Sequence, residues 1–265
     1  HSFPTRRSSD LTFENFAKEE IGIVNEPIKG FSSYVEDVID GNTSELEEYK
    51  YKSSQEFVKF LNEKINLLNK EYFNIQSVKF NGEEIVSVNE IKELFDVYYK
   101  DMPLFRRSEK IKRILTSKIK DKRDELYYAL LKEIKEKKEK LSEEELKIES
   151  NNLEFLRRMR IREIVRMVMN SREELDNWIN HEDILDLYKS MTNTKTLGYM
   201  DLSAILYLMI KLEGKKLKRE IKHIVIDEAQ DYSYLQFEVI KEITGCKSYT
   251  IVGDSNQRLI DTNEE

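Results

Sequence analysis

The stretch that most constrains the fold runs from Ile221 to Asp231 and reads Ile-Lys-His-Ile-Val-Ile-Asp-Glu-Ala-Gln-Asp. Its β-branched residues are typical of a buried parallel strand, and two carboxylates, Asp227 and Glu228, follow at the carboxyl end. Open α/β sheets place ligand chemistry at that edge. One carboxylate there can hold a hydrated Mg²⁺ and the other can orient or deprotonate an attacking water. The stretch therefore favours nucleotide hydrolysis.

A second strand with a polar end is predicted shortly afterwards. Ser233 and Gln236 form a capping box for a helix that Gly245 ends. The apolar run Tyr249-Thr250-Ile251-Val252 then leads into Gly253-Asp254-Ser255-Asn256-Gln257. Because strand-helix-strand crossovers are right-handed, we expect the two polar clusters to lie side by side.

These two clusters resemble motifs II and III of the UvrD/Rep-like superfamily 1 helicases, in which Asp-Glu-Ala-Gln-Asp is followed by Val-Gly-Asp-x-x-Gln. The resemblance implies ATP and Mg²⁺ as cofactors, with Asp227 as the magnesium carboxylate, acting through water, and Glu228 as the catalytic base. It further implies that Gln257 senses the γ-phosphate, and that Asp254 and Gln230 couple it to DNA-binding elements. The alternative interpretation is a structural carboxylate pair.

Two other segments resemble the HelD (helicase IV-like) branch of this superfamily. They are Thr12-Phe13-Glu14-Asn15-Phe16 and Tyr199 to Leu208, the segment before motif II. The resemblance implies an intact motor in which ATP binds between two RecA-like domains and drives movement relative to DNA. For this branch it also implies a helical arm that engages RNA polymerase and helps to release it from nucleic acid.

The middle of the sequence predicts a helical arm. Asn81-Gly82 between alternating apolar residues predicts a hairpin over residues 78–87, with a Ser87/Glu90 capping box after it. Long helices are predicted over about 108–140 and from 142 to about 170, joined by a tight turn. Ser171 and Glu174 predict a further helix start.

Five arginines cluster on the second of these long helices: Arg157, Arg158, Arg160, Arg162 and Arg166. They could contact phosphate or an acidic protein. Pairing with the glutamates of the first long helix is the favoured interpretation.

The expected fold class is α/β, a partial RecA-like P-loop NTPase domain with a large and mostly helical insertion. Residues 12–70 are assigned to the first RecA-like domain and the start of the insertion, 71–200 to the insertion, and 201–265 to the core segment with both motifs. Residues 1–11 resemble a translated sequencing adaptor and are excluded.

The Walker A pattern that cradles phosphates occurs nowhere in the sequence. In the family it lies upstream of the part represented here, and a second RecA-like domain supplies an arginine finger. We therefore expect an internal fragment that is inactive alone. The residues after Gln257, Arg258-Leu259-Ile260, lack the aromatic that UvrD-like proteins use for base stacking.

Composition narrows the partners. With 44 Lys and Arg against 51 Asp and Glu, the net charge is −7, which predicts weak general binding to nucleic acid and favours a local DNA contact or a protein partner. The absence of a membrane-length apolar stretch makes the cytoplasm the default. Cys246 is the single cysteine, which excludes an intrachain disulfide. His223 is interpreted as a packing residue.

Two rival functions stay open. One is a processive DNA-unwinding enzyme whose insertion merely contacts duplex. The other is a non-catalytic binding module whose helical arm engages RNA polymerase.

Overall fold

The computed structural model describes residues 11–23, 26–254 and 257. Its contacts divide the chain into two compact units. We call residues 1–70 with 182–265 the terminal unit and residues 71–181 the middle unit. The expected boundary between residues 70 and 71 coincides with the division, whereas the expected end of the insertion at 200 lies within the terminal unit. The assignment of these segments to a RecA-like core and an insertion stays a prediction.

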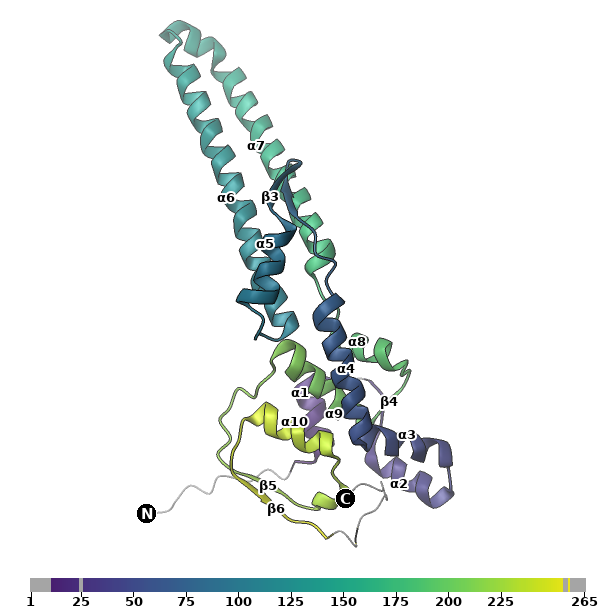
Figure 1. The fold of residues 1–265 in the computed structure, drawn as a ribbon. Helices are drawn as coiled ribbons and strands as arrows, with labels where there is room; N and C mark the ends of the chain where they lie inside the picture. The colour runs from purple at the N-terminus through teal and green to yellow at the C-terminus, as the bar shows by residue number, and fades with distance from the viewer. Residues whose placement is uncertain (1–10, 24–25, 255–256, 258–265) are drawn as a thin grey trace, which may run out of the picture. The chain divides into compact units, whose positions relative to one another are not determined.

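The terminal unit is built around helix α9, Tyr199–Leu208, in which every residue is buried. Figure 1 shows it among the other helices of this unit, and α1, α3, α8 and α10 all contact it. These helices span Phe13–Ile21, Thr43–Ser53, Ile184–Thr192 and Tyr234–Thr244. A helix that is apolar on all sides belongs inside a core, which explains its central place.

The remaining elements of the terminal unit are short, apart from α4. Helix α2 spans Phe31–Asp40 and α4 spans Gln55–Glu71. Strand β1, Ile28–Lys29, pairs in parallel with β4, Leu197–Gly198. The π-helical turn η2, Met209–Glu213, extends α9 until Gly214 adopts a left-handed conformation, φ 69°, and ends the helix.

A buried polar network ties α9 to its neighbours. The Asp201 carboxylate accepts a hydrogen bond from the Gly198 amide (2.7 Å) and another from the Tyr188 hydroxyl, and it pairs with the Lys52 ammonium (2.6 Å). All three side chains, Asp201, Tyr188 and Lys52, are buried. A buried charge needs such partners because water is absent, so the network fixes how α3, α8 and α9 pack.

The strand-helix-strand prediction is confirmed. Strand β5, Ile224–Ile226, pairs in parallel with β6, Tyr249–Ile251, and α10 runs between them from its Ser233 cap to a left-handed Gly245. The expectation of a buried strand is wrong, because β5 is three residues long and its Val225 is 66% exposed. The β5–β6 sheet has two strands, and the face that carries Val225 is left exposed.

The middle unit consists of two long antiparallel helices with a hairpin and a short helix packed on them (Figure 1). The long helices are α6, Leu104–Glu139, and α7, Glu143–Ile179. Strands β2, Val78–Phe80, and β3, Glu83–Val86, form the predicted hairpin, followed by α5, Val88–Glu93, and the π-helical turn η1, Leu94–Tyr98. Both turn residues, Asn81 and Gly82, have positive φ, as such a tight hairpin requires.

The predicted start of a new helix at Ser171 is wrong. Helix α7 continues to Ile179, and Ser171 is buried inside it with its hydroxyl donating to the Met167 carbonyl. The predicted caps at Ser87 and Ser142 are confirmed, each with the reciprocal glutamate bond of a capping box. Helices make up most of the described residues.

Candidate functional site at the carboxyl ends of β5 and β6

Asp227 and Glu228 lie where the predicted edge chemistry places them, directly after β5. The strand pairing continues past both strands, because the Val252 amide donates to the Ile226 carbonyl (2.8 Å) and the Ala229 amide donates to the Val252 carbonyl (2.9 Å). This double connection holds the turn after β5 against the turn after β6. The two polar clusters therefore lie side by side, as the crossover argument predicts.

Glu228 has a left-handed backbone conformation, with φ 51° and ψ 40°. Residues other than glycine rarely adopt it, and the cost is of order 1–3 kcal/mol unless the surroundings enforce it. Here the Ala229–Val252 bond and the short helix η3, Ala229–Asp231, fix the chain on the far side of Glu228. The sequence gives no sign of this strain, which turns the carboxylate out of the strand direction.

A chain of hydrogen bonds links four of the five predicted site residues. The Gln230 amide nitrogen donates to Glu228 Oε2 (2.6 Å), and Gln230 Oε1 accepts from the Asp254 backbone amide (3.1 Å). Gln257 Nε2 donates to Asp254 Oδ2 (3.1 Å). The fifth residue, Asp227, accepts from the Glu228 amide through Oδ1 (3.0 Å). The structure thus brings all five together.

Gly253 is a functional position that the motif contains but that residue chemistry alone does not single out. A Cβ atom there would lie 2.7 Å from Gln230 Oε1 and 3.0 Å from the Ala229 nitrogen. Any side chain would push the two turns apart, so glycine permits the close approach. Its place directly after a strand and before Asp254 is the signal that could have identified it.

The carboxylates suit a magnesium ion that keeps part of its water shell. Asp227 and Glu228 are both exposed, and no three His, Cys, Asp or Glu side chains in the described residues gather as a metal site. Magnesium is commonly held by one or two carboxylates together with waters and substrate phosphates. Two carboxylates at an open edge fit that mode of binding better than a closed protein cage.

A sequence profile of the UvrD/REP helicase N-terminal domain matches residues 35–259, most of the chain and including both turns. The chain belongs to this helicase family. Among curated proteins, none matches the sequence. Membership gives the helicase domain an ATP-dependent, DNA helicase-like function and implies nucleotide binding, a divalent metal and DNA binding in general terms. No helix in the described residues is long and apolar enough to cross a membrane.

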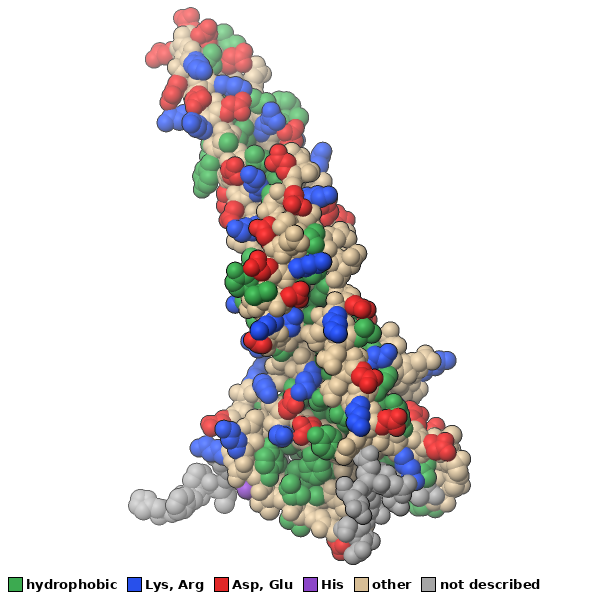
Figure 2. All heavy atoms as spheres, viewed as in Figure 1, with side chains coloured by type: hydrophobic (Ala, Val, Ile, Leu, Met, Phe, Trp, Pro, Cys, Tyr) green, Lys and Arg blue, Asp and Glu red, His purple; other side chains and the backbone are tan. Residues whose placement is uncertain are grey.

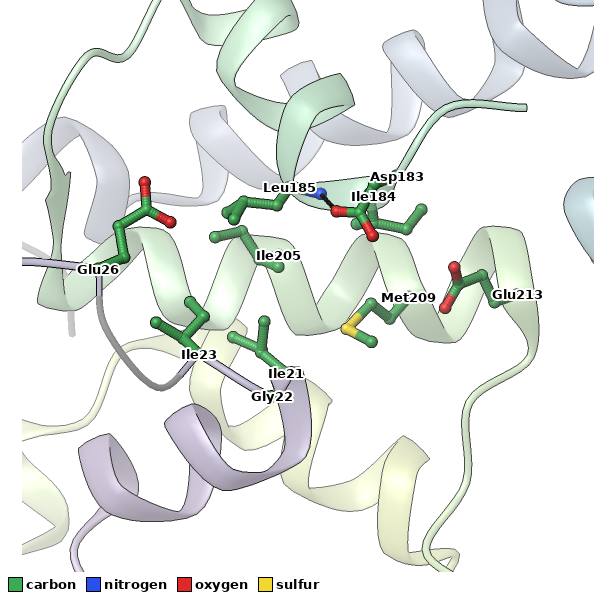
Figure 3. Close-up of a pocket in the computed structure, with 10 residues that line it drawn as sticks. All are labelled: Ile21, Gly22, Ile23, Glu26, Asp183, Ile184, Leu185, Ile205, Met209 and Glu213. Carbon is green, nitrogen blue, oxygen red and sulfur yellow. Dashed lines mark hydrogen bonds between the residues drawn. The ribbon is translucent and has the colours of Figure 1, made fainter. Parts of the chain in front are cut away.

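The terminal unit also has a pocket, which lies away from the carboxylate edge (Figure 3). It has a volume of about 340 Å³, with an apolar floor that includes Ile205 and Met209. Its acidic groups already have partners: Glu26 pairs with Lys189, and Asp183 caps α8 by accepting from the Leu185 amide (2.8 Å). The pocket therefore offers no comparable set of available oxygen ligands.

His223 does not pack into the core as predicted. It is exposed, and its ring nitrogens lie 2.7 Å from the Ser248 hydroxyl and 3.0 Å from the Thr250 hydroxyl. It thus joins the segment before β5 to the neighbourhood of β6. The expected role is wrong because the face of the sheet that His223 shares with Val225 is uncovered.

The partners of the α7 arginines also differ from those that the favoured interpretation gives them. Arg157 and Arg158 contact Glu154 (3.5 Å each) and Arg160 contacts Glu163 (3.3 Å), all within α7. None of the five forms an ion pair with α6, which is described over its whole length. Arg160 does act on α6 at longer range, because its charge adds to that of Lys137 in lowering the pKa of Glu133. Glutamates three or four residues away on the same helix lie within easy reach, and they replace the expected partners.

Proposed function

We propose that the β5–β6 edge is the magnesium- and water-activating half of an ATPase site in a UvrD-like motor. Asp227 would hold Mg²⁺ through water, and Glu228 would accept the proton of the water that attacks the γ-phosphate. The observation that carries the proposal is the hydrogen-bond chain Glu228–Gln230–Asp254–Gln257 across two adjoining strand ends.

The hydrogen-bond chain gives each residue a role. Gln230 binds Glu228 Oε2 and so orients the carboxylate, leaving Oε1 to take a proton. Gln257 would sense the γ-phosphate. Because Asp254 connects Gln257 to Gln230, movement of Gln257 would change the orientation of Glu228 and be passed toward the DNA-binding elements.

The proposed setting is a RecA-like domain with the middle unit as its helical insertion, in a cytoplasmic protein of the HelD branch. The 265 residues contain no Walker A pattern, so the phosphate cradle would come from another part of the intact protein. Without it, we expect this chain alone to show no Mg²⁺-dependent ATP hydrolysis.

Substitution Glu228→Gln tests the proposed base in the intact protein. The amide cannot accept the proton, so turnover should fall by roughly 10²–10⁴-fold while nucleotide binding persists. Glu220→Gln, an exposed glutamate outside the turn, is the matched control and should leave both unchanged. Wild-type turnover in Glu228→Gln would remove Glu228 as the base.

A second candidate is that the helical arm of the middle unit is a binding module for RNA polymerase. The balanced charge of that unit, 24 Lys and Arg against 23 Asp and Glu, favours protein over a general DNA contact. Tyr127 of α6 and Arg157 of α7 interact across the helix pair, so a short turn can join these positions and remove the distal part. We expect this shortened protein to lose polymerase binding more than DNA binding. The opposite ranking would favour an unwinding enzyme whose arm contacts duplex.

A further inference from the structure

The outer face of α7 carries an uncovered apolar stripe. Ile148 is 74% exposed, Phe155 65% and Met169 64%, and Met159 is also exposed. Figure 2 shows hydrophobic side chains among charged ones along the helices of the middle unit. The inner face of α7 is satisfied separately, because Ile164 packs with Leu130 and Ile134 of α6. The exposed stripe is therefore surplus to the fold of the helix pair.

The spacing of the stripe is that of a helix–helix interface. Ile148, Phe155, Arg162 and Met169 recur every seven residues, and Asn152, Met159 and Arg166 lie four residues after the first three. This is the heptad pattern by which one helix packs along another. Phe, Met and Arg are also enriched at protein interfaces, where Lys and Glu are depleted.

Charge changes sign along α7. Residues 143–154 contain five glutamates and one lysine, whereas residues 157–172 contain six arginines and one glutamate, and Glu173, Glu174 and Asp176 follow near the end of the helix. Arg162 and Arg166 lie on the stripe and form no ion pair among the described residues. Glu144 lies at the acidic end of the same face and is exposed. When two copies of this face lie antiparallel, the acidic end of one therefore meets the arginines of the other.

We propose that the outer face of α7 binds the same face of a second copy of this chain in antiparallel orientation. A two-fold axis beside Phe155 sets Glu144 of one copy opposite Arg166 of the other, since both lie eleven residues from Phe155. A parallel pairing would instead set arginine against arginine. Nucleic acid or an acidic protein would match only the arginine-rich residues 157–172, whereas the exposed apolar residues extend to Ile148. The proposal does not depend on the ATPase assignment.

Light scattering across a concentration series of the full chain tests the proposal directly. We expect a concentration-dependent dimer that Phe155→Ser weakens roughly tenfold or more in Kd, the equivalent of about 1.4 kcal/mol. Tyr128→Ser removes a similarly exposed aromatic from α6 (67% exposed) and is the control that should leave the dimer unchanged. Circular dichroism checks that both variants keep their helices. A chain that stays monomeric at all concentrations overturns the proposal.

Charge reversal identifies the orientation. Arg166→Glu and Glu144→Arg should each weaken the dimer several-fold, because each sets like charges opposite one another at both ends. The double variant should restore the wild-type Kd. If the double variant is weaker than either single variant, the antiparallel pairing is wrong. A loss of binding to a single-stranded DNA oligonucleotide in Arg166→Glu, with no change in dimerisation, would assign the face to nucleic acid instead.

Discussion

Helices α9 and α7 differ in how much of their surface they bury, and the difference separates the two units. All ten residues of α9 are buried, and they include Asp201 with its charged partner Lys52. In α7, by contrast, a single stripe is buried and large apolar side chains remain on the outer face. The terminal unit thus has a closed core around one helix, whereas the core of the middle unit is a thin layer between two helices.

Charge separates the units in the same way. The terminal unit has 20 Lys and Arg against 28 Asp and Glu, whereas the middle unit has 24 against 23. The acidity of the whole chain therefore belongs to the terminal unit. The near-neutral middle unit is therefore a poor general binder of nucleic acid but does not repel it as the terminal unit does, and its arginines over residues 157–172 of α7 offer a local contact.

The largest expected effect comes from opening the closed core. Asp201→Ala leaves the buried Lys52 ammonium without its main partner, and such a loss typically costs about 3–5 kcal/mol. Glu48 is the other partner of Lys52, and the Glu48 side chain is 50% exposed. Glu48→Ala should therefore cost no more than about 1 kcal/mol. Hydrogen exchange of the α9 amides measures the loss of stability in both variants.

The single tryptophan provides the internal comparison for Asp201→Ala. Trp178 is buried in the middle unit, so its fluorescence reports on the folding of that unit. We expect its urea transition to stay in place while α9 loses protection. An equal shift of both signals would show that the two units unfold together.

In the thin core of the middle unit, the stability lost on substituting a core leucine should decrease along α6. Leu115 is completely buried, whereas Leu130 lies farther along α6 and is 6% exposed. Leucine-to-alanine substitutions in cores cost about 2–5 kcal/mol, and we expect Leu115→Ala near the upper end and Leu130→Ala near the lower. The Trp178 transition in urea measures both, and the reverse order would mean that the distal part is the better packed.

Alkaline pH should weaken the terminal unit and spare the middle one. Burial by itself lowers the pKa of Lys52, but the contacts with Asp201 and Glu48 outweigh it and raise the pKa above its ordinary value of 10.5. A raised pKa means that the stabilisation is complete below pH 10.5 and is lost as the pH rises through the folded value. Thermal melts should therefore show a decline above pH 10.5 that is smaller in Lys52→Met. Part of the decline should remain, because burial also raises the pKa of Tyr34, Tyr188 and Tyr199 in this unit. An identical decline in that variant would assign it to other groups.

Local chemistry was predictable wherever neighbouring residues determine it. The Asn81-Gly82 turn and the caps at Ser87 and Ser142 depend on contacts within a few positions. The strand-helix-strand unit pairs residues farther apart, such as Ile224 with Tyr249, but its arrangement follows from the general rule for crossovers. The exposure of Val225 and the partners of His223 depend on what covers the sheet. The left-handed Glu228 depends on the hydrogen bond between Ala229 and the distant Val252. Adjacent residues record neither. The motif residues could be listed from the sequence, but their hydrogen-bond order required the two turns to be brought together.

The two Ser-x-x-Glu patterns of α7 test whether neighbouring residues or tertiary packing decide where a helix begins, with the smallest expected effect on stability. Ser142 caps the helix, with its hydroxyl accepting from the Glu145 amide, whereas Ser171 has the same pattern but lies inside the helix. Tertiary packing continues α7 through Ser171, since Leu175 and Trp178 beyond it are buried. Ser142→Ala should therefore cost about 1 kcal/mol, and Ser171→Ala should cost less because alanine favours a helix interior. If urea melts followed by Trp178 fluorescence give Ser171→Ala the larger loss, α7 begins anew at Ser171 and the long helix is wrong.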